Sequence, residues 1–401
     1  MAHSGFVRFW AADTVSLVGT YVTALALAVL AEKQLHSSNA EFGALNAARW
    51  VPYLLFGLIA GVLVDRYRRR PILIGADFAR AGLLGLIPLL TVTGLLTMPI
   101  LIGIVAVFGT LSLVYDAAHQ SFLPQLVPAA LLTEANARLE QTNSVAQGAG
   151  PALAGWLIKV AGAPVAILVD AVSYFFSGLM LRKIQVPERS PQPESRHLGR
   201  EIREGLAWVY THRVLAPLAI SSHAWFLFNG MVMTVLPFFV LRGLGFDEFV
   251  LGLTMAAAGA GGAAGASLSG RAVRRLGAGR AIIAGRWLTP VGYGLIPFAT
   301  NATTGLVLLF AGQFVFGMSI GLDGPAEMGY RQTVTPDRLQ GRMNATMRSI
   351  NRGMIVFGAP LGGILGDHLG HRATLWIAIA GLAGQAIAIS FSQVRTARLV
   401  S

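Results

Sequence analysis

A short basic turn between two long apolar runs constrains this chain more than any other feature. Four arginines lie within residues 66–70, while the runs on either side, 42–64 and 71–94, carry few charges. Each run is long enough to cross a bilayer as a helix, which takes about 20 apolar residues. Because Lys and Arg concentrate in the cytoplasmic loops of membrane proteins, the turn is predicted to lie at a cytoplasmic membrane surface.

The same alternation continues along the chain and predicts twelve membrane-spanning helices. The predicted spans are residues 6–31, 42–64, 71–94, 98–120, 133–160, 163–183, 214–240, 248–270, 279–300, 303–327, 340–366 and 372–394. A polar, proline-containing segment separates the first six spans from the last six. We therefore expect a six-helix bundle in 1–184, a cytoplasmic linker with an amphipathic helix in 185–212, and a second six-helix bundle in 213–401. The predicted fold class is an all-α polytopic membrane protein.

The composition excludes several other classes of protein. Hydrophobic residues make up 54% of the 401 residues and charged residues 12%, whereas soluble chains average roughly 25% charged residues. The net charge of +12 is spread over short loops, which argues against a nucleic-acid partner. The chain has no cysteine for a disulfide or a thiolate metal site, and it has no phosphate-binding loop motif. We expect no enzyme activity, no metal, no cofactor and no direct use of ATP.

The positions of the basic residues also predict the orientation in the membrane. Segments on one side of the spans hold 22 of the 31 Lys and Arg residues, and the loops on the other side hold four. This bias places both termini in the cytoplasm. The sequence therefore predicts a multi-pass protein of a bacterial cytoplasmic (inner) membrane, with the lipid bilayer as its surroundings and a monomer as its expected state.

The two halves of the chain resemble each other. A shift of about 208 residues places Asp116 near Asp323 and superimposes Pro128 on Pro336, and Arg80 matches Arg286 within two residues. Secondary transporters are built from such repeats, with a substrate site between the halves near the membrane midplane. The repeat predicts two pseudo-symmetric six-helix bundles.

The turn itself carries a specific motif. Gly61, Asp65, Arg66 and Arg69 match the pattern Gly-x-x-x-Asp-Arg-x-x-Arg, and the chain thereby resembles the major facilitator superfamily. The resemblance implies a charge relay at a cytoplasmic gate. The expected gate residues are Gly61, Asp65, Arg66, Arg69, Asp116 and, in the second half, Asp323. Ser269 lies near the position that matches Asp65, so the second gate is expected to be weaker.

Small residues in the fifth span form a second motif. Gly148, Gly150, Pro151 and Gly155 resemble the fifth-helix signature of antiporters in this superfamily. Small residues here would allow close packing against a helix of the other half, and general helix packing is the alternative reading. The run Leu123–Pro128 followed by Gly150-Pro151 resembles the branch of enterobactin exporters and macrolide efflux proteins.

The resemblance implies a proton-coupled exporter of small amphipathic compounds such as drugs, siderophores or natural products, working by alternating access. An importer, a lipid translocator or a non-transporting membrane sensor remain alternatives. Asp13, Glu140 and Glu327 are the candidates for proton coupling. Asp13 is preferred, because no cation lies within a helical turn to hold it ionised. Asp77 and Arg80, three residues apart, are expected to pair with each other.

Aromatic and polar residues in the seventh and tenth spans suggest a substrate cavity. Such a lining favours bulky, partly apolar ligands, although lipid-facing aromatic residues are the alternative. The candidates are Asn143, His223, Trp225, Phe226, Asn229, Gln313 and Phe314. His119 and His223 are expected to make local hydrogen bonds.

Overall fold

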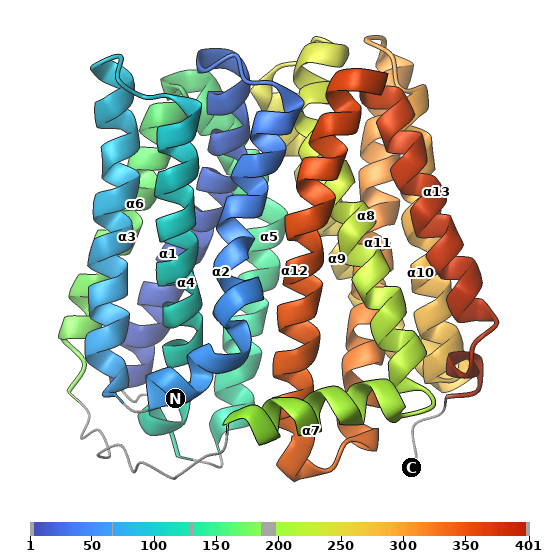
Figure 1. Cartoon of the computed structure of the whole chain (residues 1–401). Coiled ribbons are helices and arrows are strands. Elements are labelled where there is room, and N and C mark those ends of the chain that lie inside the picture. The colour runs from blue at the N-terminus through green and yellow to red at the C-terminus, as the bar shows by residue number, and fades with distance from the viewer. Residues whose placement is uncertain (1–3, 66, 129–130, 186–197, 398–401) are drawn as a thin grey trace. The chain divides into compact units, whose positions relative to one another are not determined.

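The computed structural model describes residues 4–65, 67–128, 131–185 and 198–397 (Figure 1). Within these ranges all regular secondary structure is helical. The first half comprises α1 (Ser4–Val29), α2 (Asn39–Asp65), α3 (Arg69–Val92), α4 (Met98–Leu126), α5 (Leu132–Ala161) and α6 (Ala163–Arg182). The second half comprises α7 (Leu198–Thr211), α8 (Leu215–Phe238), α9 (Glu248–Leu276), α10 (Ala278–Leu295), α11 (Thr303–Val334), α12 (Asp337–Leu369) and α13 (His371–Ser390). Short π-helical turns, Leu30–Gln34 and Phe239–Gly243, extend α1 and α8, and 3-10 turns cover Ile296–Phe298 and Gln393–Thr396.

The twelve predicted spans are therefore present as α1–α6 and α8–α13, and α7 is the predicted amphipathic helix. Three helices end well beyond their predicted spans: α4 ends at Leu126, α9 at Leu276 and α11 at Val334. Apolarity marks only the part of a helix inside the hydrocarbon layer, whereas hydrogen bonding continues the helix into water. The predicted span ends were therefore too early at these three places.

Nine of the described helices are long and apolar enough to cross a membrane by length and composition alone. The other three long helices, α5, α10 and α12, carry more polar and charged residues. Charged residues inside a span must face protein or a water-filled space. The polar residues of these three helices are therefore expected to face protein or water.

The chain divides into two compact units. Unit 1 comprises residues 1–37 and 48–196, and unit 2 comprises residues 38–47 and 197–401. Helix α2 consequently begins in unit 2 and continues into unit 1. Residues 186–197 of the predicted linker in 185–212 lie outside the described residues, whereas α7 and the residues after it are described.

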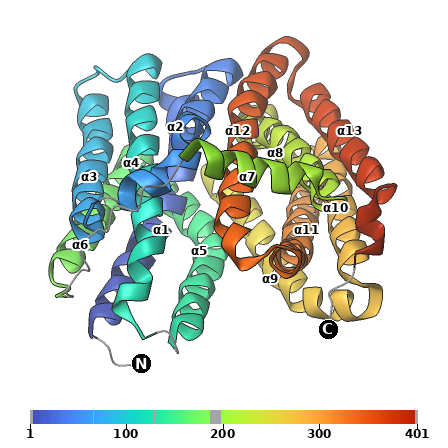
Figure 2. The same ribbon diagram turned by 60° about the horizontal axis from the view of Figure 1, so that its bottom comes forward.

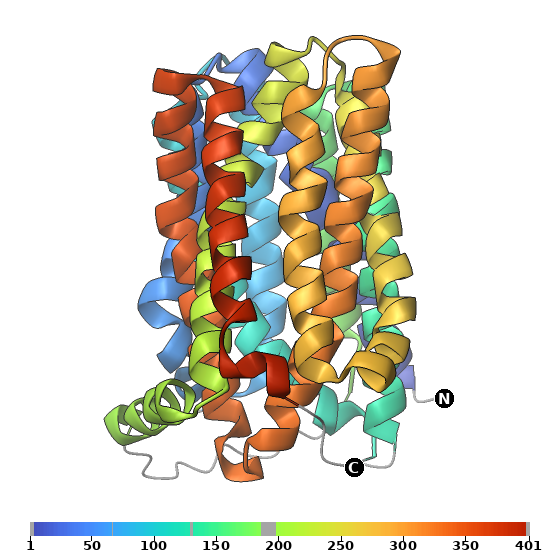
Figure 3. The same ribbon diagram turned by 90° about the vertical axis from the view of Figure 1, so that its right-hand side faces the viewer.

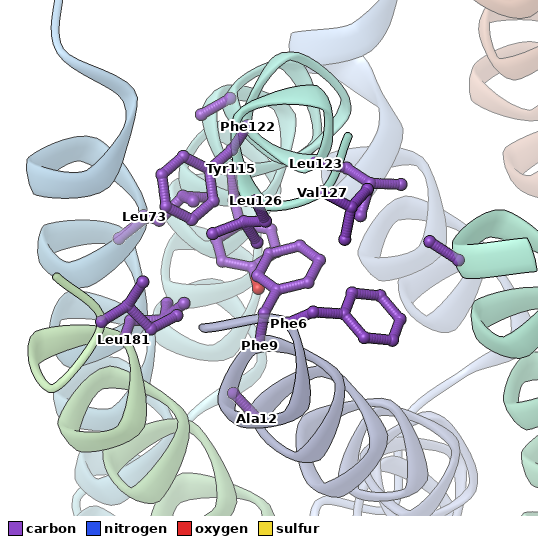
Figure 4. Packing of buried hydrophobic residues seen from close by; sticks show 14 of the residues in the cluster. Phe6, Phe9, Ala12, Leu73, Tyr115, Phe122, Leu123, Leu126, Val127 and Leu181 are labelled. Atoms are coloured by element: carbon purple, nitrogen blue, oxygen red, sulfur yellow. The ribbon is translucent and has the colours of Figure 1, made fainter. Parts of the chain in front are cut away.

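The core of unit 1 joins helix ends that are far apart in the sequence. In Figure 4, Phe6 and Phe9 of α1 pack against Phe122 and Leu126 of α4, with Leu181 of α6 nearby. Val64 and Leu73, on either side of the basic turn, belong to the same cluster. The start of α1, the basic turn and the ends of α4 and α6 therefore lie at one end of unit 1. This is the end that the charge bias assigns to the cytoplasm.

Unit 2 is held by very close helix packing. Helices α9 and α11 make its most extensive contact, followed by α10 and α11, which lie side by side in Figure 3 in amber and orange. Gly261 and Gly265 of α9 face Gly317 and Gly321 of α11, and a Cβ at any of the four would collide with the backbone of the other helix. Small residues four apart allow this approach without a strong hydrophobic driving force in lipid.

Helix α7 runs across the ends of α8 and α12 (Figures 1 and 2). Arg342 of α12 makes ion pairs with Glu201 and Glu204 of α7, and Trp208 Nε1 donates to Thr335 Oγ1 at 3.2 Å. These bonds fix the amphipathic helix to the spans of unit 2.

The first turn of α2 is capped by a residue of α12, within unit 2. Asp367 Oδ1 accepts from the backbone N–H of Asn39 at 2.9 Å and from its side-chain amide at 2.8 Å, and Oδ2 accepts from Ala40 N at 2.9 Å. The first N–H groups of a helix have no partner within the helix, so a carboxylate there satisfies them and also favours the helix dipole. Gly363 allows this approach, since a Cβ there would meet the Asn39 carbonyl.

Candidate functional site

Ionisable side chains within the spans gather in a buried cluster in each unit. In unit 2, α10 supplies Arg286, while α11 supplies Asp323, Glu327 and Arg331. These four residues are only 4 to 8% exposed. The three on α11 are four residues apart, so they occupy one face of that helix.

Arg286 bridges the two carboxylates of this cluster. Its Nη2 donates to Glu327 Oε2 at 2.5 Å, and its Nε lies 3.2 Å from Asp323 Oδ2, at ion-pair distance without hydrogen-bond alignment. Arg331 Nη1 lies 3.4 Å from Glu327 Oε1. Ser222 of α8 accepts from Arg286 at 2.8 Å and donates toward Glu327 at 3.3 Å. Two arginines thus balance two carboxylates, as burial of charge in a membrane requires.

Aromatic rings adjoin this cluster. Tyr293 of α10 stacks on Phe316 of α11 with ring centroids 4.3 Å apart, and Trp225 of α8 lies nearly parallel to Phe316 at 6.4 Å. The guanidinium of Arg286 lies 6.0 Å from the centre of the Trp225 ring. Trp225 Nε1 donates to Thr289 at 3.2 Å. The charges of unit 2 are therefore bordered by a hydrogen-bonded aromatic surface.

The cluster of unit 1 is built around Arg80 of α3. Arg80 pairs with Asp77, as predicted from their spacing, and Ser177 Oγ of α6 donates to Asp77 Oδ2 at 2.6 Å. The guanidinium lies 3.9 Å from the ring centre of Tyr115 and 4.3 Å from that of Tyr174. One carboxylate and two ring faces thus surround this arginine.

Asp13 lies on α1 at 19% side-chain exposure, facing α4. His119 Nε2 is 3.0 Å from Asp13 Oδ1, again without hydrogen-bond alignment. No cation lies within a helical turn of Asp13 along α1, but α4 brings the ionisable ring of His119 to it. The sequence did not reveal this pair because the two residues lie on different helices.

Comparison with known proteins identifies the fold that holds these clusters. A profile described as Major Facilitator Superfamily matches residues 9–359 and 218–398. The chain belongs to the Major Facilitator Superfamily. The predicted all-α fold with twelve spans in two six-helix bundles is thereby confirmed. Members of this superfamily are multi-pass membrane transporters and are not enzymes in general.

Relatives of this major facilitator include efflux proteins. It is 25% identical over 355 residues to the multidrug efflux pump Tap of Mycobacterium bovis, covering 85% of this chain and 82% of that protein. It is 27% identical over 225 residues to macrolide efflux protein A of Streptococcus pyogenes, covering 54% and 53% of the two chains. The crystal structure of the nucleoside transporter NupG matches with a TM-score of 0.76 at 12% identity, covering 97% and 98% of the two chains.

The predicted cytoplasmic gate is described only in part. The side chains of Gly61 and Asp65, and the whole of Arg66, lie outside the described residues. Arg69 begins α3, and Asp116 on α4 accepts a hydrogen bond from Tyr53 of α2 at 2.9 Å. In the second half, Asp323 is the partner of Arg286. The gate itself stays a prediction.

The small residues of α5 face α1 at one point that the structure defines. Gly150 packs so closely on Tyr21 of α1 that a Cβ would lie 2.7 Å from the Tyr21 Cβ. Pro151 and Gly155 are buried, and Gly148 is half-buried. Within unit 1, Gly150 therefore packs on α1, and packing of this motif against the other half stays a prediction.

The remaining candidates on α5 lie near the same tyrosine. Tyr21 donates to Asn143 Oδ1 and Asn143 donates to Glu140 Oε1, both at the long distance of 3.4 Å. Glu140 is exposed and Asn143 is half-buried. Of the three proton-coupling candidates, only Glu327 is thus both buried and paired with arginine.

The predicted cavity residues fall into separate environments. His223 lies between Asn351 Oδ1 and the Tyr210 hydroxyl, at 2.7 Å from each, which confirms its expected local hydrogen bonding. Asn229 accepts from Tyr293 at 2.7 Å, and Phe226 makes an edge contact with Trp225. Gln313 is 2% exposed whereas Phe314 is 39% exposed. These two neighbours therefore point in different directions and cannot line the same surface.

Apart from the pair of Asp77 with Arg80, the members of the two arginine clusters could not be grouped from the sequence. Arg80 corresponds to Arg286 in the repeat, but Arg286 and its partner Glu327 are 41 residues apart. The internal repeat was the available signal, because an ionisable residue kept in both halves of a membrane protein has a structural or functional partner.

Proposed function

We propose that this major facilitator is a proton-coupled exporter of small amphipathic compounds, working by alternating access. The observation that carries the proposal is that Asp323 and Glu327 share one arginine, Arg286, inside the membrane-spanning part of unit 2. Buried carboxylates within spans are a recurrent feature of proton-driven transporters.

Because Asp323 and Glu327 share Arg286, a proton on one of these carboxylates changes the charge balance of the cluster. With both carboxylates ionised, Arg286 and Arg331 balance them. Protonation of Glu327 removes its charge, so Arg286 is left with Asp323 as its ionised partner, and Arg331 is left with Met343 and Asn344. A proton on Glu327 therefore weakens the bonds that this residue makes with Arg286 and Arg331, and a transport cycle needs such a change.

The direction of transport and the class of substrate rest on the relatives and on the aromatic residues. Two relatives are named as efflux proteins, one for macrolides and one for multiple drugs. Trp225 and Phe226 are half-buried and make an edge contact, with Arg286 beyond them. Rigid aromatic faces suit flat, partly apolar compounds.

The test is transport of ethidium, a permanently charged aromatic dye, into proteoliposomes. With an acidic interior, protons leave as the dye enters, so we expect accumulation above that of protein-free vesicles. Accumulation driven only by an alkaline interior would contradict export by antiport and favour an importer. Binding of the dye without any flux would favour a sensor.

We also propose that both termini are cytoplasmic in a bacterial inner membrane. The chain has no cysteine, so single cysteines can be introduced one at a time. Cysteines at the exposed residues Gly94 and Asn301 are expected to react with an impermeant maleimide in whole cells, and one at Gln393 only after lysis. The reverse pattern would refute the orientation.

A further inference from the structure

One buried carboxyl group lies outside both arginine clusters. Asp170 of α6 is 0% exposed. Its Oδ2 lies 2.5 Å from Thr23 Oγ1 of α1, and its Oδ1 lies 2.9 Å from Ser173 Oγ. Among the described residues no cation lies within ion-pair distance of it, in contrast to Asp77, which pairs with Arg80. Two hydroxyl groups are a weak compensation for a buried negative charge.

The hydrogen atoms around Asp170 can be counted. Ser173 Oγ lies 2.8 Å from the backbone oxygen of Asp170 as well as 2.9 Å from Oδ1, and Thr23 Oγ1 makes the third contact. Each hydroxyl has one hydrogen to donate, so two hydrogens serve three oxygen–oxygen contacts. A carboxylic acid supplies the third, by donating from Oδ1 to Ser173 Oγ. The neutral acid therefore satisfies every contact and the ionised form does not.

The charged groups around Asp170 are already engaged. Helix α6 packs on α1, α3 and α5. On α3, Arg80 is bonded to Asp77 and lies over the ring of Tyr174. Arg80 and, to a smaller extent, Arg49 of α2 act on Asp170 only through space. No described charged group of α1 or α5 lies within ion-pair distance of it, and Gly19 of α1 packs so closely on the carboxyl that a Cβ would collide with it.

A line of polar side chains on α1 connects this carboxyl with the Asp13–His119 pair. Asp13, Ser16, Thr20 and Thr23 are spaced three, four and three residues apart, which places them on one face of the helix. Thr20 bonds the Tyr174 hydroxyl at 2.8 Å, and its own hydroxyl is bonded to the Ser16 carbonyl. From Asp13 to Thr23 this face spans about 15 Å at 1.5 Å per residue. Hydroxyl groups along it offer hydrogen-bonding positions for water and protons.

We propose that Asp170 takes up and releases a coupled proton in the transport cycle, as a second site beside the carboxylates that share Arg286, an assignment that rests on the proposed proton-coupled function. On release, the Oδ1–H bond breaks and the proton leaves to water along the α1 face. Ser173 then turns its hydrogen from the Asp170 backbone oxygen to Oδ1, while Thr23 keeps its bond to Oδ2. Uptake reverses these steps. Asp77 keeps its pairing with Arg80 and takes no part in these steps.

The first experiment detects the proton without any substrate. Infrared difference spectra of the purified protein in lipid are recorded as the pH is raised. In the wild type we expect the carbonyl band of a protonated carboxyl group to disappear as the pH is raised. The Asp170→Asn variant is expected to lack this band at every pH, whereas Asp77→Asn is expected to show it and lose it as the wild type does. The same band in Asp170→Asn as in the wild type would overturn the assignment.

Asp170→Asn is expected to fold, because an amide can accept from Thr23 and donate to Ser173 as the neutral acid does. If it does not fold, Thr23→Val removes the donor to Oδ2 and must shift the frequency of the same band. An unshifted band would then overturn the proposal.

The second experiment separates this assignment from the proposed function. Two assays are run with proteoliposomes. One measures ethidium uptake driven by an acidic interior, and the other measures exchange of ethidium across the membrane without a pH gradient. We expect Asp170→Asn to lose gradient-driven uptake, down to the rate of protein-free vesicles, and to retain exchange. Normal gradient-driven uptake by this variant would overturn the role of Asp170 while leaving the exporter intact. No coupled uptake by the wild type would refute the exporter, and with it the coupling role, whatever the infrared band shows.

Discussion

Arg80 in unit 1 and Arg286 in unit 2 occupy corresponding positions of the internal repeat but have different surroundings. Arg80 pairs with one carboxylate on its own helix and is covered by the rings of Tyr115 and Tyr174. Arg286 binds two carboxylates on a neighbouring helix, Asp323 and Glu327. Both arginines are 4% exposed. The same residue with the same exposure is thus held by one carboxylate and two ring faces in one half and by two carboxylates in the other.

The difference suggests how the halves share the work. Aromatic faces attract a cation without titrating in the physiological range, so the surroundings of Arg80 are fixed apart from its one carboxylate, Asp77. Carboxylates can gain a proton, so the bonds of Arg286 can change. We therefore expect the arginine cluster of unit 1 to be structural and that of unit 2 to rearrange, while Asp170 gives unit 1 its own titratable group.

The largest effect is expected from Arg286→Gln. Removing this arginine leaves two buried carboxylates with only Arg331, and breaking a buried pair in this way costs about 3–5 kcal/mol. Arg80→Gln is the matched control, and it leaves only Asp77. We expect a larger fall in the thermal unfolding midpoint for Arg286→Gln, with partial recovery in the double variant Arg286→Gln/Glu327→Gln. Equal falls in the unfolding midpoint for the two arginine variants would contradict the proposed difference between the two clusters.

The residue before each arginine provides a second contrast. Gly285 precedes Arg286, and a Cβ there would lie 2.5 Å from the Cβ of Asp323, whereas exposed Ala79 precedes Arg80. Gly285→Ala must push α10 and α11 apart, at a cost of about 1–3 kcal/mol. Gly82→Ala is the control, because no atom of a neighbour lies within 4 Å of its Cβ position. Similar unfolding midpoints for the two variants would show that the contact between α10 and α11 is loose.

Arg80→Lys tests the aromatic surroundings. A lysine keeps the charge for Asp77 but cannot lie flat between two rings. The lost ring contacts correspond to about 1–2 kcal/mol of stability. Tyr115→Phe keeps the ring face and is expected to leave the unfolding midpoint nearly unchanged. If Arg80→Lys is as stable as the wild type in thermal unfolding, the rings contribute only packing.

The smallest effect concerns an exposed carboxylate, Asp367. Burial raises the pKa of this group, but the hydrogen bonds from Asn39 and Ala40 outweigh it, so its pKa lies below the usual value. A lowered pKa means that the stabilisation is present above the unfolded-state value and is lost as the pH falls through the folded-state value. We expect Asp367→Asn to cost about 1 kcal/mol or less at neutral pH, because water competes for these bonds.

The measurement for Asp367 is the unfolding midpoint as a function of pH. The wild type is expected to lose this part of its stability below about pH 4, the usual range of an aspartate. The Asp367→Asn variant is expected to lack that step. A step of the same size in both would assign it to other carboxylates.

The sequence by itself determined the twelve spans, the amphipathic helix and the membership of the superfamily. The reason is that the thickness of the bilayer sets the length of every apolar run, and this signal is local. Pairs within one helical turn, such as Asp77 with Arg80, could also be predicted, because their spacing is a local signal as well. Some helix ends were missed: α4, α9 and α11 continue beyond the apolar layer, whereas α10 and α13 end before their predicted spans do.

The tertiary structure alone decided which polar residues meet. Asp13 with His119, and Asp170 with Thr23, each come from two helices, and their meeting depends on how those helices are rotated and packed. Glycine contacts such as Gly19 against Asp170 set these rotations through steric fit over many residues. A buried carboxyl with an arginine and one with only hydroxyl partners look alike in the sequence, and their different chemistry comes entirely from their neighbours.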